Sequence, residues 1–216
     1  RPCVAARSDP IQIKKLDKVG TIFDLKTPNN HYQNLFIGLL GQHQVSNAAL
    51  AVTSAEAYCP NISPKAIRQG LRKAFIPGRL EIFKNIILDG AHNPIKMKAL
   101  AQALKTLWPA KKFITIFAAK KDKDITRMLK IILPFASYFI ITQFSRFTDF
   151  GQSMAVKPPE IAKLVRKIDP QKSISLVPDS QKALQMALKL AKTDDLVLVT
   201  GSLYLVGEIR KFLSLF

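Results

Sequence analysis

The chain has 216 residues, of which 48% are hydrophobic and 22% charged, and its formal net charge at pH 7 is +18. This composition is typical of a soluble globular protein, and the length allows one large domain or two small ones. No uninterrupted apolar stretch reaches the roughly 18 residues of a membrane-spanning helix, and the N-terminus lacks the apolar segment and cleavage site of a signal peptide. Cys3 and Cys59 show no metal-ligand spacing and make no disulfide framework. We expect a cytoplasmic protein without membrane contacts.

The positive charge is spread along the sequence. Residues 1–78 carry 10 Lys and Arg against 4 Asp and Glu, and residues 79–216 carry 23 against 11. There is no arginine-rich run and no alternation of basic with aromatic residues, so a lysine-rich solvated surface is the first interpretation. A field that also favours polyanionic small ligands such as nucleotides is the second. A nucleic-acid partner is not expected.

Residues 1–76 predict a small unit of strands and helices. Short β-like segments at 3–6, 18–23 and 35–40 are separated by Asp-Pro and Thr-Pro-Asn-Asn turns, and none has an evident pairing partner. An alanine-rich helix is expected over 45–58. A second helix follows a Ser-Pro pair, a good N-cap with proline in the first turn, and runs to about residue 75. An Ile-Pro-Gly sequence then breaks the helix, and we place a domain boundary there.

Residues 77–216 show regular alternation of strand-like and helix-like segments. Apolar runs such as FITIF, YFIIT and LVLVT are typical of a parallel sheet covered by helices on both faces. Short connections favour a doubly wound, mostly parallel, Rossmann-like α/β domain with right-handed crossovers. The expected strands are 80–83, 85–88, 112–117, 138–142, 173–177 and 196–200. The expected helices are 94–107, 123–132, 158–168, 180–192 and 203–213, and 143–157 is expected to be a surface loop.

The sequence ILDGAHNP places polar groups at the end of an apolar strand. Ligands of open α/β sheets collect outside the carboxyl ends of the strands. Asp89 ends the strand, Gly90 allows a tight turn, and an Asn-Pro pair caps the next helix. Asp89 can accept hydrogen bonds from a ribose, and His92 can donate one to a carboxylate or phosphate near the helix N-terminus. The alternative is an ordinary turn residue and a surface histidine.

Two further strand ends carry similar groups. In LVTGSLYLVGEIRKF, Gly201 and Ser202 offer backbone N–H groups and a hydroxyl to an acidic ligand, unless Ser202 only caps the following helix. In FAAKKDKDITRML, Asp122 or Asp124 lies near the start of a helix. Lysines and acids that alternate in a turn usually form a solvated surface, and we prefer that interpretation for this segment.

The segments on either side of the boundary hold three more candidates. GQHQVSNAALA begins a helix after a strand, and there the Asn47 amide can face a purine edge or bond to the backbone. His43, in the same segment, is interpreted as structural. Arg79 directly follows the break at 76–78, where its planar fork of donors can reach phosphates bound between domains or form a salt bridge at a hinge.

Several common motifs do not occur in the sequence. No glycine is followed by lysine and then serine or threonine, which excludes the phosphate loop G-x-x-x-x-G-K-[ST]. There is also no GxGxxG fingerprint, no Cys/His metal cluster and no G-x-S-x-G nucleophile elbow. Any nucleotide chemistry would therefore need groups supplied from elsewhere.

The order of the motifs is more specific than any one of them. The set resembles folylpolyglutamate synthase and the bifunctional dihydrofolate synthase of the ATP-dependent Mur ligase superfamily, through GLLGQHQVSNAALAV, PGRLEIF, IILDGAHNP, KDKD and VTGSLYLVGEIR. The resemblance covers essentially the whole chain. It implies that residues 1–76 are the C-terminal remnant of a central ATP-binding domain and that residues 77–216 are the C-terminal, glutamate-ligase domain.

The resemblance implies an amide ligase that uses ATP and Mg²⁺. ATP converts a carboxylate of folate or dihydropteroate to an acyl phosphate, which the amino group of L-glutamate attacks, and positioning and charge stabilisation dominate such chemistry. By matched motif, Asn47, Arg79 and Asp89 contact ATP, with Arg79 at the phosphates and Asp89 at the ribose. His92 and Ser202 lie near the incoming glutamate and the reaction centre. We expect a monomer, with a hinge at the boundary that allows domain closure.

The family's phosphate loop, magnesium ligands and modified lysine belong to an N-terminal part that these residues do not include. FAAKKDKD also lacks the glycine that many relatives carry before the DKD turn. We therefore expect the C-terminal half of a longer ligase, which would not hydrolyse ATP alone. The alternative is a non-catalytic product of a truncated or split ligase gene with a role only in binding or assembly.

Overall fold

The computed structural model describes residues 10–144, 147–148, 151–152 and 155–213. The chain divides into two compact units, Arg1–Ile76 and Pro77–Phe216, called unit 1 and unit 2 below. No helix of the described part is long and apolar enough to cross a membrane.

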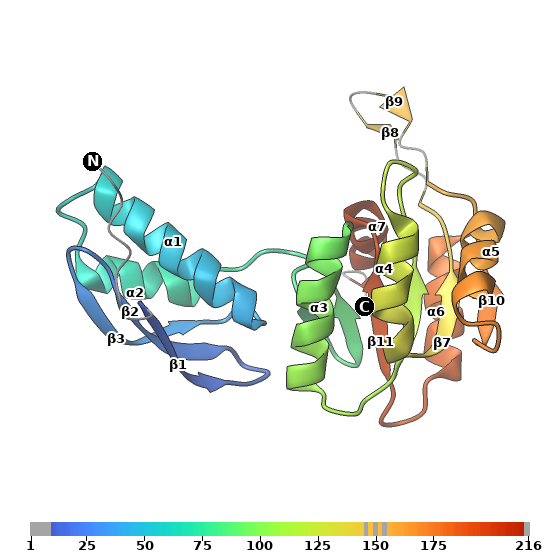
Figure 1. Ribbon diagram of the computed structural model, residues 1–216, viewed down its shortest axis with the longest axis horizontal. Coiled ribbons are helices and arrows are strands. Elements are labelled where there is room, and N and C mark those ends of the chain that lie inside the picture. The colour runs from blue at the N-terminus through green and yellow to red at the C-terminus, as the bar shows by residue number, and fades with distance from the viewer. Residues whose placement is uncertain (1–9, 145–146, 149–150, 153–154, 214–216) are drawn as a thin grey trace. The chain divides into compact units, whose positions relative to one another are not determined.

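Unit 1 is a three-stranded antiparallel sheet with two helices (Figure 1). The elements are β1 (Ile11–Leu16), β2 (Thr21–Lys26), β3 (His31–Ile37), α1 (Gln42–Tyr58) and α2 (Pro64–Lys73). The core forms between the sheet and the helices, where Phe23 and Leu35 are fully buried and pack with Val45 and Val52 of α1 and Ile67 of α2. The Ser63 hydroxyl caps α2 by accepting from the Ala66 N–H over 3.2 Å, as the Ser-Pro pair predicts.

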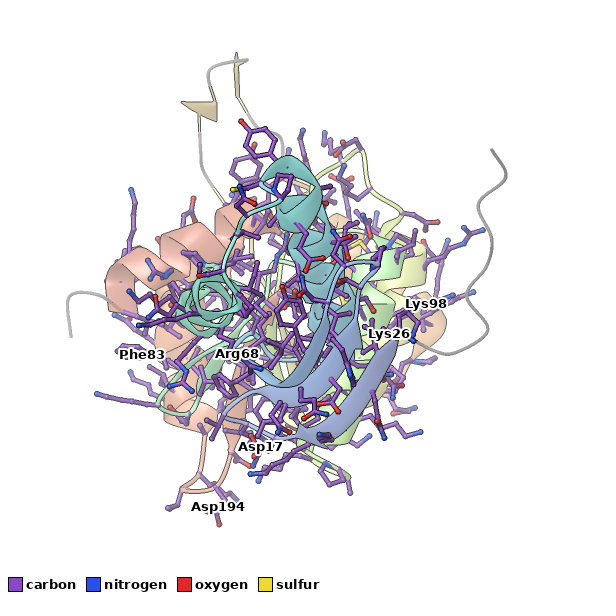
Figure 2. All side chains as sticks on the ribbon, turned by 90° about the vertical axis from the view of Figure 1, so that its left-hand side faces the viewer. Asp17, Lys26, Arg68, Phe83, Lys98 and Asp194 are labelled. Atoms are coloured by element: carbon purple, nitrogen blue, oxygen red, sulfur yellow. The ribbon has the colours of Figure 1, made fainter. Side chains whose placement is uncertain are left out.

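The prediction that the strands of unit 1 have no pairing partner is wrong. β1, β2 and β3 pair in sequence order, and the segment 18–23 is half turn and half strand. The Asp17 carboxylate accepts hydrogen bonds from the N–H groups of Val19 and Gly20, at 2.8 and 3.2 Å, and so builds the turn between β1 and β2 (Figure 2). A Cβ atom at Gly20 would lie 2.4 Å from the Ile37 carbonyl, so the sheet passes too closely for any other residue. The segment 3–6 lies outside the described residues.

Unit 2 is built on a six-stranded sheet of order β10-β7-β6-β11-β5-β4. Its strands are β4 (Glu81–Phe83), β5 (Ile86–Leu88), β6 (Phe113–Phe117), β7 (Ala136–Ile141), β10 (Ile174–Leu176) and β11 (Leu196–Thr200). All neighbours are parallel except β4 and β5, which form an antiparallel pair at one edge. The expected mostly parallel α/β domain is therefore present.

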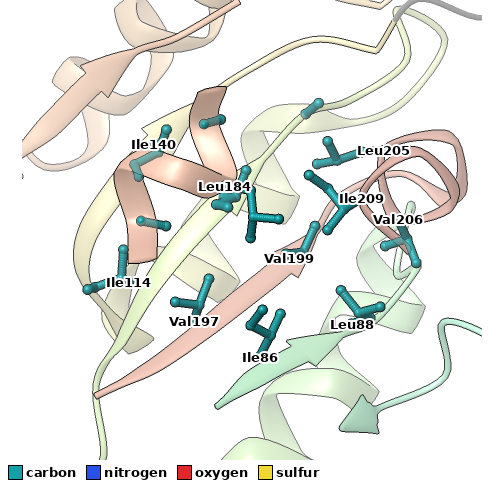
Figure 3. Close-up of a cluster of buried hydrophobic side chains, with 14 of the residues drawn as sticks. Ile86, Leu88, Ile114, Ile140, Leu184, Val197, Val199, Leu205, Val206 and Ile209 are labelled. Atoms are coloured by element: carbon teal, nitrogen blue, oxygen red, sulfur yellow. The ribbon is translucent and has the colours of Figure 1, made fainter. Parts of the chain in front are cut away.

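Helices cover both faces of this sheet (Figure 1). The helices are α3 (Pro94–Leu107), α4 (Ile125–Ile132), α5 (Pro158–Ile168), α6 (Ser180–Leu190) and α7 (Leu203–Leu213), with a short 3₁₀ turn η1 (Leu133–Phe135). On one face α3 contacts α4 and α4 contacts α5, while α6 contacts α7 on the other. On the second face, alternate strand residues such as Val197 and Val199 pack against Leu184 of α6 and Ile209 of α7 (Figure 3).

The segment 143–157 is only partly the surface loop that the sequence predicts. It contains two very short paired strands, β8 (Phe147–Thr148) and β9 (Gly151–Gln152). At its two ends the side chains of Phe144 and Val156 are buried, and the Val156 N–H donates to the Ala119 carbonyl over 2.9 Å. Residues 145–146, 149–150 and 153–154 lie outside the described residues.

Candidate functional site

The carboxyl ends of three neighbouring inner strands of unit 2, β5, β11 and β6, lie side by side. β11 lies between β5 and β6 and is parallel to both, so the connections that follow these strands meet there. The chain continues from β5 and β6 into α3 and α4 on one face, but from β11 into α7 on the other (Figure 1). Adjacent strands whose connections leave to opposite faces open a crevice, the usual ligand site of such sheets. The motifs ILDGAHNP, KDKD and TGSLYL all lie at these strand ends.

Asp89, directly after β5, is held in place by two backbone N–H groups. One carboxylate oxygen accepts from Leu80 N at 3.0 Å and the other from Ala91 N at 2.9 Å. Only 7% of the residue is exposed. Burial raises the pKa of the Asp89 carboxyl from 3.8 to about 6, although both N–H groups and the charges of Arg79 and Lys96 act in the opposite direction. At neutral pH the group is mainly a carboxylate.

The segment that carries Arg79 is fixed to the end of β5. Gly90 donates its N–H to the Gly78 carbonyl over 2.8 Å, beside the bond from Leu80 to Asp89. The Gly78 N–H donates to the Glu81 carboxylate, which also accepts from Arg210 Nε of α7 at 3.0 and 3.1 Å. The backbone at Gly78 has a φ of 66°, in the region that favours glycine.

His92 is half-buried and has a defined tautomer. Its Nδ1 lies 2.8 Å from the Gly90 carbonyl, which can only accept, so Nδ1 carries the proton and donates. Partial burial lowers the pKa of the ring, and the nearby charges of Lys96, Lys123 and Arg79 lower it further. The neutral ring therefore presents the Nε2 lone pair, to which Lys96 Nζ donates over 3.3 Å. In this state Nε2 is an acceptor.

The start of α3 positions Lys96 opposite His92. Asn93 Oδ1 accepts from the Lys96 N–H at 2.9 Å, and Pro94 occupies the first turn, as the Asn-Pro pair predicts. This cap places the Lys96 side chain on the turn that faces the histidine ring. The Lys96 ammonium group therefore reaches His92 from the first turn of α3, whereas the other polar groups of the site come from the connections directly after the strands.

Ser202 follows β11 through a turn that only glycine can form. Gly201 has a φ of 98°, and a Cβ atom there would lie 2.3 Å from the Ala118 carbonyl. The Ser202 residue is 3% exposed, and its hydroxyl oxygen accepts from the Tyr204 N–H at 3.2 Å. This bond is a cap of α7, the alternative that the sequence left open for Ser202, and it leaves the hydroxyl hydrogen available to a ligand.

His92 and Ser202 line the same cavity, which has a volume of about 390 Å³. The full lining is His92, Lys120, Lys123, Gly201, Ser202, Leu203 and Tyr204. Two ammonium groups and a hydroxyl around one cavity suit a ligand with carboxylate or phosphate groups. The solvated turn that the sequence predicts for KKDKD therefore also forms part of the cavity wall, and both lining lysines pair there with Asp122, at 4.0 and 2.9 Å. Lys120 and Lys123 line the cavity, while Lys121 and Asp122 are exposed.

Two other candidate residues lie away from this cavity lining. Asn47 is exposed on α1 of unit 1 and donates from its amide to the Gln44 side chain over 3.0 Å. Arg79 is half-buried in unit 2, next to the bonds that hold Asp89. No hydrogen bond or ion pair of the Arg79 side chain occurs among the described residues of its own unit. The contacts of Asn47 and Arg79 with ATP stay predictions.

The described residues contain no cluster of metal-ligating side chains. No group of three or more His, Cys, Asp or Glu side chains among them could hold a metal ion. Mg²⁺ prefers several oxygen ligands in near-octahedral geometry.

Comparison with known proteins decides the family. The profile described as dihydrofolate synthetase, C-terminal domain, matches residues 81–213, which is almost all of unit 2. The chain belongs to this family. Its relatives also include a UDP-N-acetylmuramyl-tripeptide synthetase from Leifsonia xyli subsp. xyli, in agreement with the predicted link to the Mur ligases.

The chain spans less than half the length of the dihydrofolate synthases and folylpolyglutamate synthases that it matches. The dihydrofolate synthase/folylpolyglutamate synthase of Bacillus subtilis is 33% identical over 206 residues, which are 90% of this chain and 45% of that protein. The folylpolyglutamate synthase of Thermotoga maritima is 28% identical with a TM-score of 0.75, over 94% of this chain and 46% of that one. The enzyme of Mycobacterium tuberculosis, solved with ADP and AMPPCP, shares the fold with a TM-score of 0.81, at 24% identity over 94% of this chain and 48% of that one.

In this member of the dihydrofolate synthase family, sequence reasoning missed three cationic residues of the site. Lys96 faces His92, and Lys120 and Lys123 line the cavity. The helix cap at Asn93 and the position of KKDKD directly after an apolar strand were signals that could have identified them. The sequence does not reveal, however, that β11 lies between β5 and β6, and this strand order brings the three connections together.

Proposed function

We propose that this chain carries the glutamate-adding part of an ATP-dependent folate ligase. The observation that carries the proposal is the cavity at the ends of β5, β6 and β11, which His92, Ser202 and two lysines line. Membership of the dihydrofolate synthase family supports the reaction class. The ligands are ATP, L-glutamate, and folate or dihydropteroate.

The reaction is a transfer of an acyl group in two steps. In the first, the γ-phosphoryl group of ATP moves to a carboxylate oxygen of the folate substrate, and ADP leaves. In the second, the amino nitrogen of L-glutamate attacks the acyl carbon. The new C–N bond forms, the bond from that carbon to the phosphate oxygen breaks, and inorganic phosphate leaves. The nitrogen loses a proton to a base or to water, so the products are an amide, ADP, phosphate and a proton.

The cavity supplies groups for the second step. Lys120 and Lys123 bind the carboxylates of the incoming glutamate, which compete for the two ammonium groups with Asp122, at 4.0 and 2.9 Å from them. The Ser202 hydroxyl donates to the acyl phosphate or to glutamate. The neutral His92 ring, with a protonated Nδ1, keeps Nε2 as an acceptor, and on binding the amino group of glutamate takes the place of Lys96 Nζ at this nitrogen and is oriented by it.

The nucleotide side of the proposal rests on Asn47, Arg79 and Asp89. Arg79 reaches the phosphates, and its segment is held by Asp89 through the Leu80 N–H. Each Asp89 oxygen keeps a further lone pair that can accept from the ribose. Asn47 contacts the nucleotide through its exposed amide. In this arrangement Asp89 acts on ATP directly and also by positioning Arg79.

The experiment measures ligase activity of the full-length gene product. The protein, with any coding sequence that precedes this chain, is assayed for glutamate-dependent ADP release with dihydropteroate and with tetrahydrofolate. We expect release with at least one substrate and none when glutamate is omitted. A soluble, folded full-length protein that releases no ADP with either substrate would contradict the proposal and favour a role in binding or assembly alone.

A further inference from the structure

Unit 1 has a basic groove that is separate from the residues discussed above. It lies between β3 and α2 and has a volume of about 340 Å³. Its lining consists of Asn34, Phe36, Lys65, Arg68, Gln69 and Arg72. Three of these six residues are cationic and none is acidic. We propose that this groove binds a short linear oligoanion, in which two or three carboxylates or phosphates are joined in one chain.

The three cations lie in a row on one face of α2. Positions 65, 68 and 72 fall within about 60° of the helix circumference and extend about 10 Å along its axis. Arg68, labelled in Figure 2, stands at the middle of the row and donates from Nη1 to the Asn34 carbonyl of β3 over 3.3 Å. A single small anion would meet only part of such a row, whereas a chain of anionic groups can contact all of it.

The positive charge of α2 is not neutralised within the described part of the chain. The helix sequence PKAIRQGLRK contains four cations and no acid, and no ion pair among the described residues includes an α2 side chain. One carboxylate, that of Asp24, contacts the groove residue Asn34, but its charge is paired with a lysine outside the groove. Asp24 pairs with Lys14 at 2.9 Å and accepts from the Asn34 N–H at 2.8 Å. The groove therefore keeps a net positive potential.

The groove also offers groups that select among anions. Arg68 and Arg72 can each form two parallel bonds to a carboxylate or phosphate. Phe36, a half-buried lining residue of the groove, supplies an apolar surface against which the linking atoms of an oligoanion can pack. The cations span only about two turns of helix, a footprint for a few charges rather than for a long nucleic acid.

The experiment measures binding of short anions to this chain. Fluorescein-labelled triglutamate and inorganic tripolyphosphate are titrated at 0.15 M salt, the first by anisotropy and the second by calorimetry and by competition. We expect saturable binding of at least one, and the tighter of the two identifies carboxylate or phosphate as the preferred group. Binding of neither would overturn the proposal. The assay involves no ligase reaction, so its result is independent of the proposed function.

Variants of exposed residues locate the binding. Arg68→Gln and Arg72→Gln should each weaken binding about tenfold, as expected for loss of one charge-assisted pair. The triple variant with Lys65→Gln should bind too weakly to measure. Lys73→Gln removes an exposed cation of the same helix that does not line the groove, and should change affinity less than about twofold.

Three outcomes of this series would contradict the assignment. Equal losses for Lys73→Gln and Arg68→Gln would show attraction to general charge rather than to the groove. Unchanged affinity in the triple variant would place the binding elsewhere. Tighter binding of a 12-nucleotide RNA than of either short anion, with the same dependence on Arg68 and Arg72, would assign the groove to nucleic acid. Circular dichroism melts confirm that each variant is folded, and Arg68→Lys serves as the variant that keeps the charge.

Discussion

The carboxylate of Asp89 accepts a hydrogen bond from the Leu80 N–H over 3.0 Å, and this bond ties the residue next to Arg79 to the end of β5. The same side chain accepts from the Ala91 N–H. Asp89→Ala would leave both N–H groups buried without an acceptor, at about 1–3 kcal/mol each. We expect the free energy of unfolding to fall by about 2–4 kcal/mol in urea titrations. A loss below about 1 kcal/mol would mean that water replaces the carboxylate.

The pH dependence of stability should reveal the raised pKa of Asp89. Its pKa is 3.8 unperturbed and about 6 in the folded protein, so the folded state favours the protonated form. The contribution to stability is fully present below about pH 4 and is lost as the pH rises through 6. The size, for about two pKa units, is at most about 3 kcal/mol.

Asp89→Asn cannot ionise and should lack this contribution. The free energy of unfolding of the wild type minus that of Asp89→Asn should therefore fall between about pH 4 and 6 and then level off. His92, whose pKa is lowered, contributes stability that is lost as the pH falls, but it titrates in both proteins and cancels in the difference. A difference that rises with pH would mean that the pKa of Asp89 is lowered.

Gly201 is predicted to tolerate no side chain. Gly201→Ala would place a Cβ atom 2.3 Å from the Ala118 carbonyl at a φ of 98°, and should lower the free energy of unfolding by more than about 2 kcal/mol. Gly207→Ala is the control, because no heavy atom lies within 4 Å of a Cβ atom there. In the middle of α7 it should stabilise the protein by about 0.5–1 kcal/mol. Equal effects of both changes in thermal melts would contradict the geometry.

The pair of Glu81 and Arg210 should matter more than an exposed ion pair. The Glu81 side chain is 15% exposed and accepts from both Arg210 Nε and the Gly78 N–H. Glu81→Ala should therefore cost about 1–3 kcal/mol of unfolding free energy. Arg127→Ala breaks a pair with Asp124 in which the Arg127 side chain is 76% exposed, and should cost less than about 0.5 kcal/mol. Chemical denaturation of the two variants side by side tests the difference.

In the full-length ligase, His92 should affect the glutamate step. His92→Ala removes the Nε2 acceptor and should lower kcat with glutamate about 10²- to 10⁴-fold, with little change in the KM for ATP. Lys98→Ala, an exposed cation of the same helix region, is the control and should behave as the wild type. If His92→Ala raised only the KM for ATP, the histidine would belong to the nucleotide side of the site.

The elements of unit 2 follow from sequence because buried parallel strands must be apolar on both faces. LVLVT predicts β11 with its observed bounds, and FITIF predicts β6 to within one residue. Caps are equally local, since Asn93 and Ser63 each bond to an N–H three residues later. In unit 1 the amphipathic segment IQIKKL gives no continuous apolar run, and β1 was missed for that reason.

The candidate site is less predictable from sequence, because its residues follow strands that are neighbours in the sheet but far apart in the chain. Sequence places His92 and Ser202 after two different strands, but their common cavity depends on the insertion of β11 beside β5. Lys120 and Lys123 resemble surface residues in sequence, since alternating charges in a turn are usually solvated. One of the two N–H groups that bond to the Asp89 carboxylate belongs to Leu80, nine residues earlier, and no local pattern indicates this pairing.

The central position of β11 also has a consequence for biosynthesis. β5 ends at Leu88 and β6 begins at Phe113, yet neither can complete its pairing until residues 196–200 leave the ribosome and enter between them. Such non-local pairing is slow, and apolar edges that wait for a partner are prone to aggregation. A nascent chain stopped before Leu196 would hold β6 with β7 but would leave β5 with only β4. The cavity is thus among the last features to form, and a truncated product would expose the strand edges that β11 normally covers.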